Sequence, residues 1–377
     1  MNMRKMGNTG IELSALGFGC MRLPTLENGA IDEKEAIRII RDAIDNGLNY
    51  VDTAYYYHDQ QSEVLVGKAL QDGYREKVYL ATKQPEYNIE KEEDFDNFLN
   101  TQLERLQTDH IDFYLLHALN RRTWDEKVVP FHVLDKMKKA KEDGRVRHLG
   151  FSFHDDFDTF KMIVDSFDGW EFCQIQMNYI DIENQATLKG LEYAAQKGLG
   201  VVIMEPLLGG KLANLSPQVK EKLDPAKTPV EWALDFLWNR PEVSVILSGM
   251  GSEQMVKDNM TYASRSHVGM LSEKDIDMLM QARAEYQTRA LVPCTGCAYC
   301  MPCPFGIDIP GMYEVYNQTV NRSREDSLAA YEALSVKADA CKKCRRCEKA
   351  CPQQISPLQT MPEIDAYFAK LREELKK

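Results

Sequence analysis

The stretch most informative about the architecture is residues 78–117, VYLATKQPEYNIEKEEDFDNFLNTQLERLQTDHIDFYLLH. It begins and ends with short apolar runs, Val78–Ala81 and Ile111–Leu116, whose composition is typical of strands buried on both faces. Between them, Glu93–Leu106 carries apolar residues at helical spacing. A strand, a helix and a second strand in this order predict a βαβ unit with parallel strands.

The same alternation extends over residues 11–265. Eight apolar runs predict strands: Leu13–Gly19, Leu48–Val51, Val78–Ala81, Ile111–Leu116, Val146–Phe151, Phe172–Met177, Gly200–Met204 and Val243–Leu247. Helical patterns lie between them, of which Asp155–Val164 is the weakest. Eight strand–helix units in about 255 residues match the size of a (β/α)8 barrel.

A doubly wound sheet is the competing architecture. A dinucleotide-binding sheet of that kind requires G-x-G-x-x-G after its first strand, but Gly17-Phe18-Gly19 is followed by Cys20-Met21-Arg22. We therefore predict an α/β protein with a TIM barrel over residues 1–265. Arg4–Leu13 is predicted to form a hairpin that covers the barrel floor.

Composition excludes several classes of function. The chain has 377 residues, with 58 acidic and 46 basic side chains and a net charge of −12, which argues against nucleic-acid binding. We find no apolar run as long as a membrane helix, and no apolar core follows the charges at the N-terminus. We therefore expect a cytoplasmic protein with no membrane or nucleic-acid partner.

The end of the chain differs in character from the barrel region. Residues 266–290 are predicted to form a connecting helix, and residues 291–377 a second domain that ends in a helix. Eight of the ten cysteines lie between Cys294 and Cys351, and in a chain without an export signal this indicates metal ligation rather than disulfides. Cys20 and Cys173 stand apart and are predicted to be small buried hydrophobic residues.

Four polar residues near predicted strand ends form a candidate acid site. They are Asp52, Tyr57, Lys83 and His117. Singly, each has an ordinary structural explanation, as a helix cap, a solvated charge or a core residue. Together, Lys83 held charged by Asp52 would lower the pKa of Tyr57, and His117 would orient a carbonyl oxygen beside the phenol. This combination predicts proton donation during carbonyl reduction.

These residues resemble the catalytic tetrad of the aldo-keto reductase family. The matching motifs are Asp52-Thr53-Ala54-x-x-Tyr57, Ala81-Thr82-Lys83 and Leu115-Leu116-His117, and the resemblance covers roughly residues 1–265. It implies that Tyr57 is the general acid and that the cofactor is NADP or NAD. By the same resemblance, the positions expected to bind the cofactor are Ser152, Gln174, Met204, Glu205, Leu207, Gly209, Lys211, Ser248, Met250, Met255 and Asn259.

The cofactor motifs depart from the family pattern at several positions. Phe153 replaces the usual asparagine, and Met204 replaces the aromatic residue that stacks on nicotinamide. Gly249 and Met255 stand where many members have the lysine and arginine that contact a 2′-phosphate. The choice between NADP and NAD therefore stays open.

The cysteines form two runs that resemble dicluster [4Fe–4S] ferredoxin domains over about residues 290–355. The first is Cys294-x2-Cys297-x2-Cys300-x2-Cys303-Pro304, and the second is Cys341-x2-Cys344-x2-Cys347-x3-Cys351-Pro352. The resemblance implies two clusters, one held by Cys294, Cys297, Cys300 and Cys351, the other by Cys341, Cys344, Cys347 and Cys303. Structural zinc is the alternative, although zinc sites usually use cysteine pairs. Lys342, Lys343, Arg345 and Arg346 are either solvated charges, a device that favours the reduced cluster, or a docking surface for an acidic electron carrier.

The sequence thus predicts an NAD(P)H-dependent oxidoreductase that acts on a small carbonyl or alcohol substrate and carries [4Fe–4S] clusters. The second hypothesis is an electron-transfer or redox-sensing subunit whose barrel only binds nucleotide.

Overall fold

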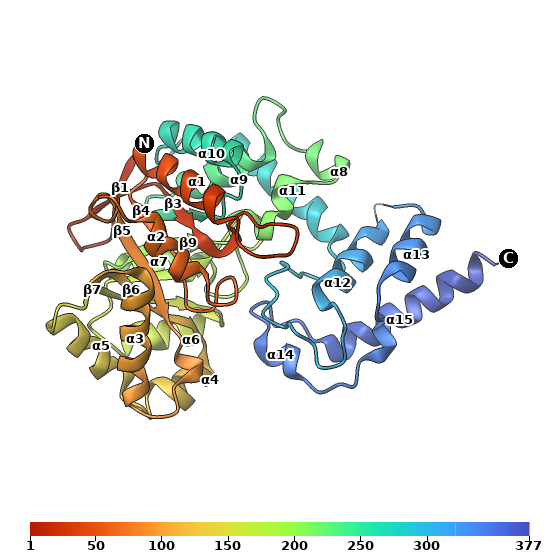
Figure 1. Cartoon of the computed structure of the whole chain (residues 1–377). Helices are drawn as coiled ribbons and strands as arrows, with labels where there is room; N and C mark the ends of the chain where they lie inside the picture. Colours follow the sequence, from red (N-terminus) through yellow and green to blue (C-terminus); the bar gives the residue numbers. More distant parts are fainter. Residues whose placement is uncertain (321, 377) are drawn as a thin grey trace. The chain divides into compact units, whose positions relative to one another are not determined.

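The structure, a computed structural model, describes residues 1–320 and 322–376 (Figure 1). The chain divides into two compact units. The first joins Met1–Pro206 to Glu231–Ser272, and the second joins Leu207–Val230 to the part of the chain that begins at Glu273. The domain boundaries expected from the sequence stay a prediction.

The first unit contains a closed barrel of eight strands in the order β10-β3-β4-β5-β6-β7-β8-β9. Every neighbouring pair is parallel, which confirms the predicted barrel rather than a doubly wound sheet. The strands are β3 (Leu16–Gly19), β4 (Tyr50–Asp52), β5 (Tyr79–Gln84), β6 (Ile111–Leu119), β7 (Val146–Phe153), β8 (Phe172–Gln176), β9 (Gly200–Met204) and β10 (Val245–Ser248).

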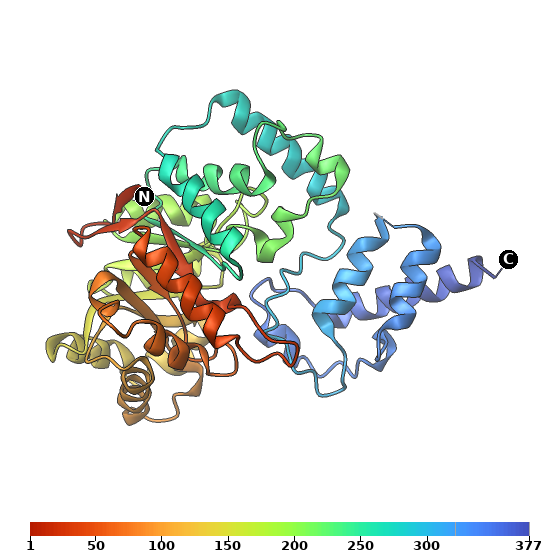
Figure 2. The ribbon, with the colours of Figure 1, turned by 45° about the horizontal axis from the view of Figure 1, so that its top comes forward.

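Helices lie around the outside of the strands (Figures 1 and 2). The helices of this unit are α1 (Glu33–Asp45), α2 (Ser62–Ala69), α3 (Glu93–Leu106), α4 (Arg121–Thr123), α5 (Val133–Glu142), α6 (Phe157–Asp165), α7 (Thr187–Gln196), α9 (Pro229–Trp238) and α10 (Glu253–Arg265), whereas α8 (Pro217–Lys220) belongs to the second unit. The weakest predicted helix forms as α6, because the Asp156 side chain caps it by accepting from the Thr159 N–H.

The floor of the barrel is closed by an antiparallel hairpin, β1 (Met3–Lys5) and β2 (Glu12–Ser14), as predicted. Met6 and Leu13 are fully buried and belong to the same core cluster as the inward residues Phe113 and Phe172. Strand packing is close here, since a Cβ on Gly150 would lie 2.5 Å from the Phe172 ring. The hairpin therefore completes the lower end of the barrel core.

The second unit is mostly helical, with α11 (Glu273–Arg289), α12 (Ile309–Asn317), α13 (Arg324–Ala333), α14 (Arg346–Ala350) and α15 (Pro357–Glu374). It has its own core, in which the Tyr331 and Phe368 rings stack with centroids 4.0 Å apart. Six cysteines pack against this core: Cys294, Cys300, Cys303, Cys341, Cys347 and Cys351. In the part of the chain that the structure describes, no helix is both long and apolar enough to span a membrane.

Several strands run further than their apolar residues indicated, and two of these extensions concern the candidate site. β5 continues to Gln84 and β6 to Leu119, so Lys83 and His117 lie within strands rather than after them. Composition did not reveal this extension because these positions are polar. Their side chains are nevertheless buried.

Candidate active site and cysteine groups

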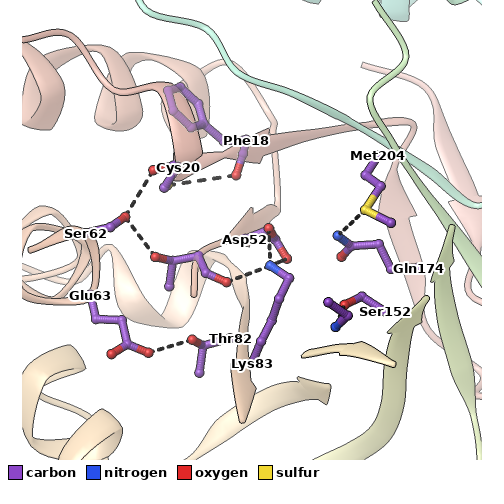
Figure 3. Close-up of polar contacts among 12 residues, drawn as sticks. Phe18, Cys20, Asp52, Ser62, Glu63, Thr82, Lys83, Ser152, Gln174 and Met204 are labelled. Atoms are coloured by element: carbon purple, nitrogen blue, oxygen red, sulfur yellow. Dashed lines mark hydrogen bonds and ion pairs between the residues drawn. The ribbon is translucent and has the colours of Figure 1, made fainter. Parts of the chain in front are cut away.

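The centre of the candidate site is an ion pair between strands β4 and β5. Lys83 Nζ lies 2.6 Å from Asp52 Oδ1 and 2.8 Å from Oδ2, and it also donates to the Thr53 carbonyl oxygen at 2.7 Å. Figure 3 shows the Lys83 side chain reaching toward Asp52. Both side chains are almost fully buried, at 0% and 2% exposure. The barrel interior thus holds a charged lysine with its charge largely compensated.

Tyr57 and His117 complete a cluster with this pair. Lys83 Nζ lies 5.0 Å from the centre of the Tyr57 ring, and the Tyr57 and His117 rings meet edge-on with centroids 6.1 Å apart. Burial, and then the charges of Lys83 and His154, hold the pKa of His117 well below its usual range. A neutral imidazole beside a phenol can hold a carbonyl oxygen between them.

The pKa of Tyr57 is raised in the structure, whereas the sequence led us to expect it to be lowered. Burial raises the pKa of Tyr57 well above its ordinary value, and the nearby Asp52, Cys20 and Glu205 raise it further. The main physical reason is burial, which disfavours the charged phenolate, and the Asp52 carboxylate adds to it. Tyr57 is therefore held as a neutral phenol.

An irregularity in β6 supports the histidine. Pairing with β7 shifts between Leu116 and Leu119, and Ala118 adopts a left-handed conformation with φ of 52°. Two side chains satisfy the backbone groups at the bulge. Glu86 Oε2 accepts from the His117 N–H at 2.6 Å, and Ser152 Oγ accepts from the Ala118 N–H at 2.7 Å.

Glu86 is a site residue that the sequence analysis missed. It is fully buried, its Oε1 has no hydrogen-bond partner among the described residues, and burial raises its pKa well above the ordinary value. The available signal was its position three residues after Lys83, past the end of the same strand. Tyr56 was also missed, and its ring centre lies 6.0 Å from that of His117.

Three residues expected at the nicotinamide lie close together on β7, β8 and β9. Gln174 donates through Nε2 to the Met204 sulfur at 3.5 Å, and Ser152 is buried nearby (Figure 3). Gln174 Oε1 is buried and accepts no hydrogen bond from the described residues. A buried acceptor without a donor fits the amide group of a carboxamide, so these residues fit a nicotinamide.

The loop expected at the pyrophosphate is a short helical turn, Leu208–Ala213, that follows Leu207. Gly209 and Gly210 have φ of 66° and 95°, a conformation in which glycine is strongly favoured. The Gly210 N–H donates to the Leu207 carbonyl oxygen, so this amide is already used. Lys211 Nζ lies 3.5 Å from a Glu314 carboxylate oxygen. Both contacts compete with the expected phosphate contacts.

Residues expected at the adenosine end lie on β10, on α10 and between them. Ser248 and Asn259 are buried and bonded, with Asn259 Nδ2 donating to Ser248 Oγ at 2.9 Å. Met250 is buried, whereas Met255 is 52% exposed. The structure thus brings Ser248 and Asn259 together but leaves Met255 at the surface.

The cysteines fall into neighbouring groups. Burial raises the pKa of Cys300 to about 12, and the adjacent Cys297, Cys294 and Cys351 raise it too. Cys347 has its pKa raised by burial and by Cys341 and Cys344. The first group thus contains four thiols and the second contains three. Groups of this size fit the ligand sets of iron–sulfur clusters. Among the described residues no three ligand side chains converge as a single-ion site, and a role for Cys303 in the second set stays a prediction.

Comparison with known proteins agrees with both halves of this description. The model of the Aldo/keto reductase family matches residues 15–283. The chain belongs to the aldo/keto reductase family. A second model, of a 4Fe-4S dicluster domain, matches residues 293–355. The chain is therefore an aldo/keto reductase with a C-terminal iron–sulfur domain, as its sequence motifs predicted.

Several individual aldo/keto reductases and oxidoreductases are similar to this chain. L-galactose dehydrogenase from Arabidopsis thaliana is 28% identical over 286 residues, which are 69% of this chain and 87% of that protein. The uncharacterized oxidoreductase YrpG from Bacillus subtilis is 32% identical and covers 57% of this chain and 69% of its own. A thermostable aldo-keto reductase solved with the inhibitor epalrestat has a TM-score of 0.63 at 25% identity, covering 75% of this chain and all of its own. Aldo-keto reductase AKR11C1 from Bacillus halodurans, at 24% identity and a TM-score of 0.62, shares the fold.

Proposed function

We propose that this aldo/keto reductase transfers hydride between NAD(P) and the carbonyl or alcohol carbon of a small substrate. The observation that carries the proposal is the buried cluster of Asp52, Tyr57, Lys83 and His117 at the carboxyl ends of neighbouring strands. In barrel enzymes this end of the strands is the place where chemistry occurs.

Each side chain in the cluster has a separate task. The Tyr57 hydroxyl donates its proton to the carbonyl oxygen as negative charge develops there, and takes a proton back in the oxidation. Neutral His117 donates a hydrogen bond to the same oxygen and orients the substrate. Lys83 and Asp52, paired at 2.6 Å, place a compensated cation beneath the phenol ring.

The residues that would hold the nicotinamide are Gln174, through its Oε1 acceptor, and Ser152, through its hydroxyl. Met204 supplies a polarisable surface near Gln174 in place of an aromatic ring. When bound, the cofactor supplies the hydride in reduction and accepts it in oxidation.

Charges on α10 favour NADH over NADPH. Lys257 is paired with Glu253, and Arg265 lies 2.7 Å from Glu231 and 3.3 Å from Asp235. Glu253 also pairs with Arg38 at 3.1 Å. A 2′-phosphate at the start of this helix would meet the Glu253 carboxylate and the Lys257 and Arg38 side chains that are engaged with it, while Arg265 lies at the far end of the helix.

The C-terminal domain is proposed to hold two [4Fe–4S] clusters. Cys294, Cys297, Cys300 and Cys351 would ligate one, and Cys341, Cys344, Cys347 and Cys303 the other. Clusters of this kind exchange single electrons, whereas nicotinamide exchanges a hydride. Because the neighbouring thiols fit such clusters, they favour a second candidate role. In that role the protein transfers single electrons or senses redox state, and the barrel only binds nucleotide.

An anaerobic titration with NADH and then NADPH tests the proposal. The nicotinamide band and the sulfur-to-iron charge-transfer band are followed together, and then aldehydes and ketones are added. In a separate arm, L-galactose is added with the oxidised cofactor, because a dehydrogenase of this sugar is similar to the chain. We expect substrate-dependent change of the nicotinamide band while the iron–sulfur band stays. Bleaching of the iron–sulfur band without any substrate turnover would favour the electron-transfer role instead.

A further inference from the structure

The second cysteine run contains an exposed basic loop, Lys342–Arg346. Lys342, Lys343, Cys344, Arg345 and Arg346 are all exposed to solvent. The flanking Cys341 and Cys347 are half-buried and pack against the core of the domain. Cys344 is thus the one thiol of its group that lies openly at the surface.

The cations of this loop are not neutralised by neighbours. Among residues 1–320 and 322–376, Lys342, Lys343 and Arg346 form no ion pair. Arg345 lies 4.0 Å from Glu348, and that glutamate also accepts a hydrogen bond from Ser356. Elsewhere the chain pairs many of its cations, for example Arg38 with Glu35 and Asp42. A concentrated positive charge on a protein of net charge −12 therefore surrounds Cys344.

The backbone of the loop supports this presentation. Lys343 and Arg345, the two neighbours of Cys344, adopt left-handed conformations with φ of 56° and 61°. Residues other than glycine adopt this conformation uncommonly. The loop turns sharply on both sides of the thiol.

We propose that Lys342–Arg346 is the docking surface for a small acidic protein that carries single electrons. This rests on the iron–sulfur part of the proposed function, and it assigns to that part a partner and a point of entry. One electron leaves the reduced carrier and one enters the oxidised cluster ligated through Cys344, so no further reductant is needed. The carrier's carboxylates face the loop, and the exposed ligand shortens the path between the two redox centres.

The small size of the basic loop favours an acidic protein over nucleic acids and anionic membranes as its partner. The basic loop spans five residues, whereas nucleic acids and anionic membranes contact long tracks or wide surfaces. Where such polyanions extend past the loop, they would meet a chain whose remaining net charge is negative. A small carrier with one acidic patch fits a small basic site.

The experiment uses the full-length protein with its clusters reconstituted anaerobically and a reduced plant-type [2Fe–2S] ferredoxin as the probe. Iron and acid-labile sulfide are measured first, and their absence would overturn this inference and the iron–sulfur part of the proposed function, but not the proposed hydride transfer. Carrier binding is then measured by calorimetry at low and high salt, and cluster reduction by electron paramagnetic resonance. The test variant is Lys342→Glu/Lys343→Glu/Arg346→Glu, and its milder partner replaces the same three residues with glutamine.

The matched control is Lys139→Glu/Lys189→Glu/Lys222→Glu, which makes the same change in net charge at exposed lysines outside the loop. We expect the loop variant to keep its iron, to lose salt-sensitive binding, and to be reduced about tenfold or more slowly. The glutamine variant should be intermediate and the control close to the wild type. Equal binding by the test and control variants, or loop-dependent binding of a DNA duplex or anionic vesicles but not of ferredoxin, would overturn the inference. If both the glutamate and the glutamine variants lose iron, the salt dependence of ferredoxin binding to the wild-type protein tests the inference instead. Binding that does not depend on salt would overturn the inference.

Discussion

The ammonium group of Lys83 lies 2.6 Å and 2.8 Å from the two carboxylate oxygens of Asp52, with both side chains shielded from solvent. The pair joins two adjacent strands, β4 and β5, beneath the ring of Tyr57. It is therefore a structural element of the barrel as well as part of the candidate acid site, and these two roles can be separated by mutation.

Replacing only one partner of this ion pair should destabilise the barrel more than replacing both partners. Lys83→Met leaves a buried carboxylate without its cation, which costs about 3–5 kcal/mol. The double variant Lys83→Met/Asp52→Asn should recover much of that loss. Urea unfolding followed by tryptophan fluorescence measures this selectively, because Trp124, Trp170, Trp232 and Trp238 all belong to the barrel unit. A double variant as unstable as Lys83→Met would contradict the expectation.

Removing the Tyr57 hydroxyl should abolish proton donation without unfolding the protein. Tyr57→Phe is expected to lower kcat for carbonyl reduction by about 10²- to 10⁴-fold, since this is the usual contribution of a general acid. NADH binding, measured by fluorescence titration, should stay close to the wild type because Gln174 and Ser152 are unchanged. Tyr56→Phe serves as the neighbouring aromatic control. Full turnover by the Tyr57 variant would rule out the assigned acid.

The pH profile of reduction should be level through neutrality. Burial raises the pKa of Tyr57 well above its usual value of 10.0, so the phenol stays protonated and active as the pH rises. His117, with its pKa well below 6.5, stays neutral over the same range. We expect kcat/KM for reduction to be constant from about pH 7 to about pH 9. A fall through this range would mean that Lys83 lowers the phenol pKa after all.

Glu86 should make the barrel less stable as the pH rises. Burial raises the pKa of this carboxyl in the folded state, so folding takes up a proton between the ordinary value of 4.5 and the raised one. Stability present at low pH is then lost with rising pH, by at most about 1.4 kcal/mol per pH unit. Glu86→Gln should remove this dependence while its carbonyl oxygen still accepts from the His117 N–H. The free energy of unfolding of the wild type and of Glu86→Gln is measured at pH 5, 7 and 9. The same dependence on pH in both proteins would refute the prediction.

Loss of one cysteine should remove one cluster rather than both. Cys300→Ser is expected to lower iron from about eight to about four atoms per chain after anaerobic reconstitution, because its neighbours Cys294, Cys297 and Cys351 belong to one group. Cys173→Ser, in the buried barrel core, should keep the full content. Complete loss of iron in Cys300→Ser would show that the two groups do not assemble independently.

The sequence was sufficient for the barrel and for bringing four polar residues of the candidate site together. Apolar runs alternating with helices predicted parallel strands, and such strands bring their carboxyl ends together, so Asp52, Lys83 and His117 could be expected to meet although they lie far apart in the chain. The cysteine spacings predicted the iron–sulfur domain in the same way, because short spacings constrain ligands locally.

Other features depend on atoms that no local pattern brings together. Glu86 reaches the backbone of His117 across 31 residues of sequence, and the bulge that frees this N–H arises from the pairing of β6 with β7. The resemblance had already assigned Cys351 to the first cysteine group, and the structure places it beside Cys300 and against the core of the second unit. The direction of the Tyr57 pKa shift also required the structure, since it depends first on how deeply the phenol is buried. Spacing along a chain can place a residue at a site, but burial and distance set its charge.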